Sequence, residues 1–268
     1  MPRKYVHVDG TAVHYLHTGA TTPPDVPPAL DRGRVFLFVH AAGSNAGMWR
    51  RQLEGLASRH SAVAPDLPGH GRSSGVDGLP TVEAYADFLA RFADLVCPRP
   101  FVLVGRSMGG AVALVFAARH PSRCAGLVLT CTAARFELAP DRIRAVYDVV
   151  RGRLPQQFTT ETFSPATGMD LVREAWMEQV KTDPRVRHGD LLACQAFDGR
   201  PLLAGIRTPT LVVAGADDGV TPVGQSEQLA RGIPGARLEV IERAGHQAPL
   251  EQSERYNGLL AAFAEGLA

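Results

Sequence analysis

The chain has 268 residues, which is enough to bury one full hydrophobic core with an inserted subdomain. Its formal net charge of +1 gives no reason to expect nucleic acid or an anionic membrane surface as a partner. No apolar run approaches the roughly 20 residues that span a bilayer, and residues 1–10 hold no apolar segment of the kind found in secretory signals. We therefore expect a cytoplasmic protein, monomeric or homodimeric, without nucleic-acid or membrane partners.

The chain opens with a hairpin signal and continues as an alternation of strands and helices. Residues 5–8 and 11–18 alternate apolar and polar side chains around Asp9-Gly10, which predicts a half-buried hairpin. Residues 20–33 carry four prolines and are typical of an exposed loop. Buried strands are predicted at 35–39, 62–64, 101–104, 125–130, 210–214 and 238–241, and helices at 48–60, 81–96, 111–120, 223–233 and 251–267.

This alternation predicts a mostly parallel sheet with helices on both faces. In such sheets, functional groups gather at the carboxyl ends of the strands. The alternation stops at residues 134–197, where apolar residues follow helical spacing in pieces separated by proline and glycine. We interpret 134–197 as a helical cap, and 1–133 together with 198–268 as the core domain.

A serine stands where the strand predicted at residues 101–104 ends. The sequence continues as Gly105-Arg-Ser107-Met-Gly109, and residues 111–120 then follow helical spacing. A strand that turns directly into a helix exposes a strained serine at the corner, and a side chain at either glycine would collide with a neighbouring strand or helix. The alternative is that Ser107 caps the helix. We favour the nucleophile elbow because the rest of the chain supplies partners for a nucleophile.

Two turns that follow other strands also carry polar or small residues. Residues 40–45 come directly after a buried strand, where free backbone N–H groups suit half of an oxyanion hole. An ordinary strand-to-helix loop is the alternative there. Asp66 and His70 lie in a second turn, dense in proline and glycine. We interpret their side chains as braces of that turn rather than as catalytic groups.

Two aspartates and a histidine follow the last two predicted strands. Asp217 and Asp218 come after the strand at 210–214, and His246 comes after the strand at 238–241. Adjacent residues of an extended segment point in opposite directions, so only one of the aspartates can face the histidine. A solvent-exposed loop histidine is the alternative interpretation of His246.

Five short motifs occur in a fixed order along the chain. They are His40-Ala-Ala-Gly43, Asp66-Leu-Pro-Gly-His-Gly71, Gly105-Arg-Ser-Met-Gly109, Gly215-Ala-Asp-Asp218 and Gly245-His246. With them, nearly the whole chain resembles the α/β-hydrolase superfamily, in its capped serine-hydrolase branch. The order of nucleophile, acid and histidine is the one that this fold uses. The resemblance implies a mostly parallel eight-stranded sheet with a helical cap inserted after strand 6.

The resemblance also implies a role for each motif. Ser107 would be the nucleophile, His246 the general base, and Asp218 the acid that orients the histidine. The backbone amides of Ala42 and Met108 would form the oxyanion hole. This chemistry needs no metal and no organic cofactor.

Four further residues are candidates for contact with the substrate: His40, Ala41, Arg106 and Trp176. Related chains usually have glycine where this chain has Ala41, and a positive φ at that position would strain alanine. Trp176 has a second interpretation, as packing within the cap itself. The cap arginines Arg144, Arg151 and Arg153 are candidates for binding an acidic substrate, although most such arginines are solvated surface residues.

The first hypothesis for function is hydrolysis of a carboxylic ester of a small substrate through an acyl-enzyme. The alternatives are enol-lactone hydrolysis, hydrolysis of a C–C bond in an aromatic-degradation product, and a ligand receptor or acyltransferase on the same fold. The partner would be a small ester or lactone. The four cysteines follow no metal-ligand or disulfide pattern, and we expect them to be buried apolar residues, at Cys97, Cys124, Cys131 and Cys194.

Overall fold

The computed structural model describes residues 1–97 and 100–267. Residues 98, 99 and 268, which fall within the predicted core domain, lie outside the described part. In the described part, eight strands form one sheet in the order β1-β2-β4-β3-β5-β6-β7-β8. They are β1 (Arg3–Val8), β2 (Thr11–His17), β3 (Val35–Val39), β4 (Ser61–Pro65), β5 (Phe101–Arg106), β6 (Cys124–Thr130), β7 (Thr210–Gly215) and β8 (Arg237–Ile241).

The predicted mostly parallel sheet is confirmed. The strands from β4 through β8 pair in parallel, and β2 pairs antiparallel with both β1 and β4. The turn between β1 and β2 has two left-handed residues, Asp9 at φ 49° and Gly10 at φ 80°. Consecutive left-handed residues match the twist of a two-residue hairpin, which explains why Asp-Gly stands there.

The helices of the core lie close to their predicted positions. Two predicted helices are each divided: residues 46–56 form a short 3-10 turn, η1 (Ala46–Trp49), followed by α1, and the last helix is interrupted at Gln252. Thr81 caps α2, because its hydroxyl accepts a hydrogen bond from the amide of Ala84 at 3.1 Å. The core helices are α1 (Arg50–Leu56), α2 (Val82–Val96), α3 (Met108–Arg119), α7 (Val223–Gly232), α8 (Ala248–Glu251) and α9 (Ser253–Glu265).

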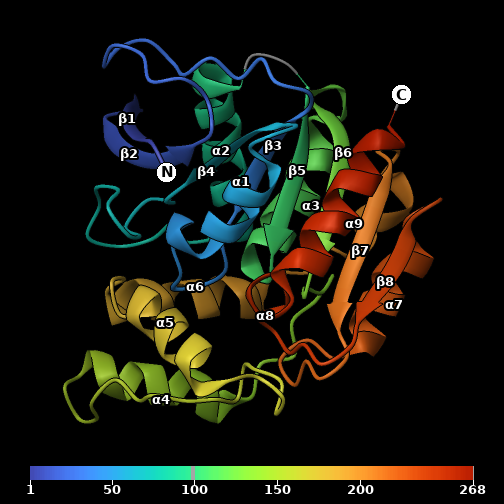
Figure 1. Cartoon of the computed structure of the whole chain (residues 1–268). Helices are drawn as coiled ribbons and strands as arrows, with labels where there is room; N and C mark the ends of the chain where they lie inside the picture. The colour runs from blue at the N-terminus through green and yellow to red at the C-terminus, as the bar shows by residue number, and fades with distance from the viewer. Residues whose placement is uncertain (98–99, 268) are drawn as a thin grey trace.

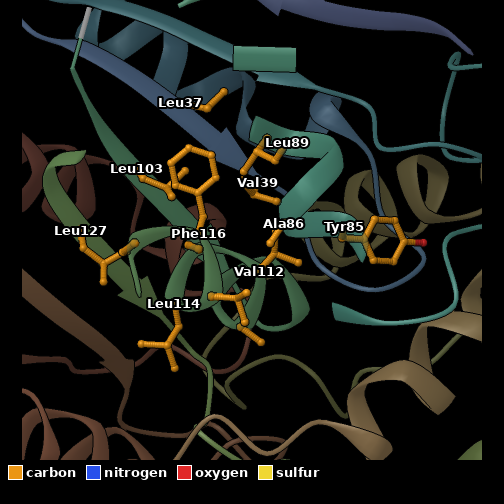
Figure 2. Packing of buried hydrophobic residues seen from close by; sticks show 14 of the residues in the cluster. Leu37, Val39, Tyr85, Ala86, Leu89, Leu103, Val112, Leu114, Phe116 and Leu127 are labelled. Carbon is orange, nitrogen blue, oxygen red and sulfur yellow. The ribbon is translucent and has the colours of Figure 1, made fainter. Parts of the chain in front are cut away.

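Both faces of the sheet are covered, and alternate strand residues belong to different clusters. Leu37 and Leu103 pack with α2 and α3 on one face, whereas Phe36 and Val102 pack with α1 and α9 on the other. Figure 2 shows the first cluster, with the hydroxyl of Tyr85 directed away from the other labelled side chains. The unbroken apolar runs of the central strands follow from this two-sided burial.

Three helices lie between β6 and β7 in the chain: α4 (Pro140–Val150), α5 (Met169–Gln179) and α6 (Pro184–Ala196). In Figure 1 they lie together beyond the arrowheads of β5 and β7, which mark the carboxyl ends of those strands. Ile143 and Val146 of α4 pack against Leu191 of α6 in a small separate cluster. The segment therefore has apolar packing of its own and stands at the end of the sheet where a site is expected.

The cysteines are buried and free, as the sequence predicts. Burial raises the pKa of the Cys97 thiol to about 12, so this thiol stays protonated and unreactive at neutral pH. Within residues 1–97 and 100–267, no helix combines the length and the apolar character needed to cross a bilayer.

Candidate active site

Ser107 stands at a sharp corner between β5 and α3. Its backbone has φ 54° and ψ −122°, a conformation that L-residues rarely adopt and that costs about 1–3 kcal/mol. Its hydroxyl makes no capping hydrogen bond to α3, so the alternative interpretation as a helix cap is not supported. Two hydrogen bonds hold the Ser107 backbone: its amide donates to the Thr130 carbonyl at 3.0 Å, and its carbonyl accepts from the Thr132 hydroxyl at 2.7 Å.

The glycines on either side of Ser107 are required by close packing, as predicted. A Cβ on Gly105 would collide with the carbonyl of Gly109, in the first turn of α3. A Cβ on Gly109 would collide with the backbone carbonyls of Val39 and His40, at the end of β3. The glycines thus allow α3 to begin directly against β3 and β5, which brings its first turn close to the turn at residues 40–45.

His246 and Asp218 form a buried hydrogen-bonded pair. His246 Nδ1 donates to Asp218 Oδ2 at 2.9 Å, which leaves Nε2 as the acceptor nitrogen. The Asp218 carboxylate also accepts from the amides of Val220 and Thr221, at 2.8 and 2.9 Å, and from the Thr221 hydroxyl at 2.8 Å. Burial alone would raise the pKa of Asp218, but the charge of His246 and these hydrogen bonds hold it below its ordinary value.

The neighbouring Asp217 points away from His246. Its side chain is exposed, and its Oδ2 accepts from the Ser164 hydroxyl of the cap at 2.5 Å. Its amide donates to the Ala244 carbonyl at 2.9 Å. The two aspartates therefore face opposite sides of their loop, as the sequence predicts, although Asp217 finds a cap residue rather than solvent alone.

The turn at residues 40–45 takes its shape from Gly43 rather than from Ala41. Gly43 has φ 61°, whereas Ala41 is outside the left-handed region, so alanine is unstrained there. Among the described residues, no acceptor contacts the amide of Ala42 or the amide of Met108. Two amides, one on this turn and one at the start of α3, are thus free to donate to an oxygen of a ligand.

His40 is fully buried beneath this turn. Its Nδ1 donates to the Ala41 carbonyl at 2.9 Å, and its Nε2 accepts from the Leu67 amide at 3.1 Å. Burial, together with the nearby charge of His70, lowers the pKa of His40 to about 4. The ring is therefore a neutral brace with both nitrogens occupied, and it does not line the pocket that Ser107 opens onto.

Asp66 braces the same region, as the sequence predicts. Its Oδ1 accepts from the Ala46 amide at 2.6 Å, and its Oδ2 accepts from His14 Nδ1 and from the Arg72 amide, each at 2.8 Å. Burial raises the pKa of Asp66, but these donors outweigh it and hold the pKa below its ordinary value. The carboxylate joins β2, the first residue of η1 and the loop that carries Arg72.

A buried carboxylate of the cap, Asp190 in α6, also fixes the turn at residues 40–45. Its Oδ2 accepts from the Gly43 amide at 2.8 Å and from His70 Nε2 at 2.7 Å, and its Oδ1 accepts from the Tyr85 hydroxyl at 2.6 Å. His70 Nδ1 donates to the Pro68 carbonyl at 2.9 Å, so both ring nitrogens donate and the ring is an imidazolium. Burial lowers the pKa of His70, but the charge and hydrogen bond of Asp190 raise it overall.

A second carboxylate, Glu251 in α8, fixes the loop that carries His246. Its Oε1 accepts from the amides of Gly245 and Gln247, at 2.9 and 3.1 Å. Its Oε2 accepts from the Ser164 amide at 2.7 Å and from the Thr167 hydroxyl at 2.5 Å, both in the cap segment. Neither Asp190 nor Glu251 stands in a recognisable motif, which is why sequence reasoning missed both.

Core and cap residues together line a pocket of about 80 Å³ that contains Ser107 and His246. Of the other predicted substrate contacts, Ala41 and Arg106 line it, and so does Ala42. The Arg106 guanidinium is buried and donates to Gln247 Oε1 and to the His246 carbonyl, so it supports the histidine loop from behind.

Trp176 lies outside this pocket, for a physical reason. Its ring packs edge-on against Phe158, with ring centroids 5.9 Å apart, within the cap. Its neighbours on α5, Ala175 and Gln179, line the pocket instead. The interpretation of Trp176 as cap packing is the one that the contacts favour.

The chain is similar to several known proteins along most of its length. The model of the alpha/beta hydrolase fold family matches residues 34–253. A pimeloyl-[acyl-carrier protein] methyl ester esterase of Neisseria meningitidis is 30% identical over 247 residues, which cover 87% of this chain and 94% of that protein. A thermophilic esterase from Thermogutta terrifontis superposes with a TM-score of 0.82 and 29% identity, covering 99% of this chain and 98% of that one. An enol-lactonase from Burkholderia xenovorans superposes with a TM-score of 0.80 and 25% identity, covering 97% and 98%.

Proposed function

Because the chain belongs to the alpha/beta hydrolase fold family, we propose that it is a serine hydrolase that cleaves a carboxylic ester of a small substrate. The observation that carries the proposal is the arrangement at the pocket. Ser107 stands at a strained elbow, and His246 lines the same pocket with its Nδ1 bonded to Asp218 at 2.9 Å. The esterases among the similar proteins support an ester as the substrate.

In the first half of the reaction, Ser107 is acylated. His246 Nε2 takes the hydroxyl proton as Ser107 Oγ attacks the ester carbonyl carbon, and Asp218 stabilises the imidazolium that forms. The carbonyl oxygen becomes an oxyanion, which accepts hydrogen bonds from the amides of Ala42 and Met108. When the intermediate collapses, the ester C–O bond breaks and the leaving alcohol takes the proton from His246 Nε2.

In the second half, water repeats the sequence. His246 takes a proton from water as the water oxygen attacks the acyl carbon. The second oxyanion occupies the same two amides, and its collapse expels Ser107 Oγ, which recovers its proton from His246. The products are a carboxylic acid and an alcohol. The cap, residues 134–197, closes the pocket above Ser107 and selects the acyl group.

A lactone is the second candidate substrate, and the enol-lactonase among the similar structures supports it. A lactone is a cyclic ester, so the same two half-reactions apply and the leaving alcohol stays attached to the acyl group. A panel of 4-nitrophenyl esters of graded acyl length, together with simple lactones, distinguishes the two. Steady turnover with either class also separates a hydrolase from a ligand receptor, which would react slowly or once.

Substitution of the nucleophile tests the proposal directly. Ser107→Ala should lower kcat on a short 4-nitrophenyl ester by a factor on the order of 10⁴ to 10⁶, because no other group can form the acyl-enzyme. Thr160→Ala, on the exposed surface of the cap, is a control that should keep the wild-type rate. A Ser107→Ala protein that is folded and still turns over at the wild-type rate would refute the assignment.

A further inference from the structure

The pocket around Ser107 has an unbalanced charge. Three arginines line it: Arg106 from the core, and Arg142 and Arg187 from the cap. No aspartate or glutamate is among the described residues that line it. The chain as a whole has 28 basic and 27 acidic residues, so this imbalance is local. A concave site lined by charge of one sign favours a ligand of the opposite sign.

Arg187 of α6 lies directly over the turn at residues 40–45. A Cβ built on Gly43 would come within 2.5 Å of Arg187 Cγ, so the arginine stem occupies the space that the missing side chain leaves. The residue is half-buried. Burial, together with the charge of Arg142, lowers the pKa of its guanidinium. The Arg187 side chain therefore packs against Gly43, the residue that follows Ala42, in a place where water solvates its charge poorly.

Neither Arg142 nor Arg187 has a protein partner in the described part of the chain: no hydrogen bond or ion pair joins either guanidinium to an acceptor. Other cap arginines do have partners. Arg153, Arg173 and Arg185 pair with aspartates at distances of 2.9 to 3.2 Å. The exposed Arg144 and Arg151 have no ion pair in the described residues either, so what sets Arg142 and Arg187 apart is that they line the pocket without a counter-charge.

The acidic residues near this pair do not neutralise it. Asp190, on the same helix as Arg187, is occupied by Gly43, His70 and Tyr85. Asp141 and Glu161 line a neighbouring cavity of about 490 Å³ that Arg142 and Arg187 also border, but neither forms an ion pair with them in the described residues. Arg142 and Arg187 therefore line both cavities, and no described acidic residue pairs with either of them.

We propose that the substrate carries a carboxylate, which Arg142 and Arg187 bind while Ser107 attacks the ester group. This inference rests on the proposed function and names the substrate class of the same site. A guanidinium forms strong, directional hydrogen bonds with a carboxylate, and a half-buried cation without a partner gains the most from one. The chemical class is a half-ester of a small dicarboxylic acid, or a lactone that bears a carboxylate. Hydrolysis of the half-ester releases an alcohol and a dicarboxylate.

Two matched esters test this inference. They are mono-4-nitrophenyl glutarate, whose acyl chain ends in a carboxylate, and 4-nitrophenyl hexanoate, a neutral ester of similar length. We expect the wild-type protein to have the higher kcat/KM on the glutarate ester. Arg187→Gln and Arg142→Gln should each lower the ratio of the two kcat/KM values by about 10- to 100-fold, the size expected for one charge-assisted hydrogen bond.

Two variants control for structure and charge. Arg144→Gln removes an exposed arginine from α4 that does not line the pocket, and it should leave the ratio unchanged. Arg142→Lys keeps the positive charge, and it should lower the ratio less than Arg142→Gln does. A thermal melt of each variant confirms that it is folded before the rates are compared.

Inhibition gives a second readout, independent of the acyl group. Glutarate should inhibit hexanoate ester hydrolysis competitively, with an inhibition constant that rises about tenfold or more in Arg187→Gln. Inhibition by inorganic phosphate but not by glutarate would overturn the carboxylate assignment. A higher kcat/KM on the neutral ester would also overturn it, and so would a ratio of kcat/KM values that is the same in wild type and in both arginine variants. Neither result would affect the proposed function, because Ser107-dependent hydrolysis would remain. If the wild-type protein hydrolyses neither ester, the proposed function itself is contradicted.

Discussion

Asp217 and Asp218 are adjacent in the chain and differ in every contact. Asp218 accepts from His246 Nδ1 and from Thr221, whereas Asp217 is exposed and accepts from Ser164. Asp218→Asn keeps the shape of the side chain but favours the wrong tautomer of His246. We expect kcat to fall by a factor on the order of 10³ to 10⁴, as in other serine triads.

Asp217→Asn is the matched control for this change, because it replaces one oxygen of the neighbouring carboxylate by the same NH2 group. It weakens one part-buried hydrogen bond, from the Ser164 hydroxyl, which does not involve His246, so kcat should fall only a few-fold. Steady-state kinetics of both variants on one ester decide between the aspartates. If Asp217→Asn is the more damaged variant, Asp218 is not the residue that orients the histidine.

The turn at residues 40–45 is held in part by hydrogen bonds with the cap. The Gly43 amide donates to Asp190 Oδ2 at 2.8 Å, and Ala42 directly precedes Gly43 in the chain. Asp190→Ala should therefore let the Ala42 amide drift from the oxyanion position, and kcat should fall by about 10- to 100-fold with a smaller change in KM. It should also destabilise the fold by about 3 kcal/mol, because it leaves His70 buried without its counter-charge.

Tyr85→Phe separates these two effects. It removes the hydrogen bond to Asp190 Oδ1 and the one that the hydroxyl accepts from the Leu79 amide, and it leaves the bond from Gly43 intact. We expect a loss of stability of about 1 kcal/mol and a kcat within about threefold of wild type. Equal losses of kcat in the two variants, measured at a temperature where both are folded, would show that Asp190 does not position the turn.

The order of strands and helices could be predicted from the sequence, and so could the positions of Ser107, Asp218 and His246. Each of these three follows a strand within a local motif, so neighbouring residues identify it. Asp190 and Glu251 could not be found in the same way. The contacts by which they join core and cap lie far along the chain, 147 residues from Asp190 in the case of Gly43 and 87 residues from Glu251 in the case of Ser164. The break between η1 and α1 was also missed, because the apolar spacing continues through it.

At the scale of the whole molecule, buried histidines make stability depend on pH in two opposite directions. The pKa of His40 is lowered to about 4 by burial, and burial lowers the pKa of His17 and His60 as well. These rings bind protons more readily when unfolded, so stability falls as the pH drops below about 6.5. The pKa of His70 is raised in the fold, so its contribution is complete below about pH 6.5 and is lost as the pH rises through its folded pKa.

Urea unfolding across this range tests the balance. The urea concentration at the midpoint should rise between about pH 4 and 6.5, because the histidines that are buried in the fold lose their protons in the unfolded chain over this range. The midpoint should fall at higher pH, as His70 loses its proton in the folded protein. Asp190→Asn removes the charge that raises the pKa of His70, so the fall above about pH 6.5 should shrink in this variant while the rise below it stays. An unchanged alkaline slope in Asp190→Asn would count against the His70–Asp190 pair as its origin.

The attachment of the cap to the turn at residues 40–45 has a consequence for recombination between relatives. Besides the bond from Gly43 to Asp190, the Thr182 hydroxyl donates to the Ser44 carbonyl at 3.0 Å, and the Asn45 amide group donates to the Glu178 carbonyl at 2.9 Å. A cap transplanted from another hydrolase brings a different set of groups to this turn. A chimera that exchanges residues 134–197 alone would therefore change the rate of acylation together with the choice of acyl group. Only a transplanted cap that keeps a hydrogen-bond acceptor at position 190 for the Gly43 amide would change the acyl specificity without changing the rate of acylation.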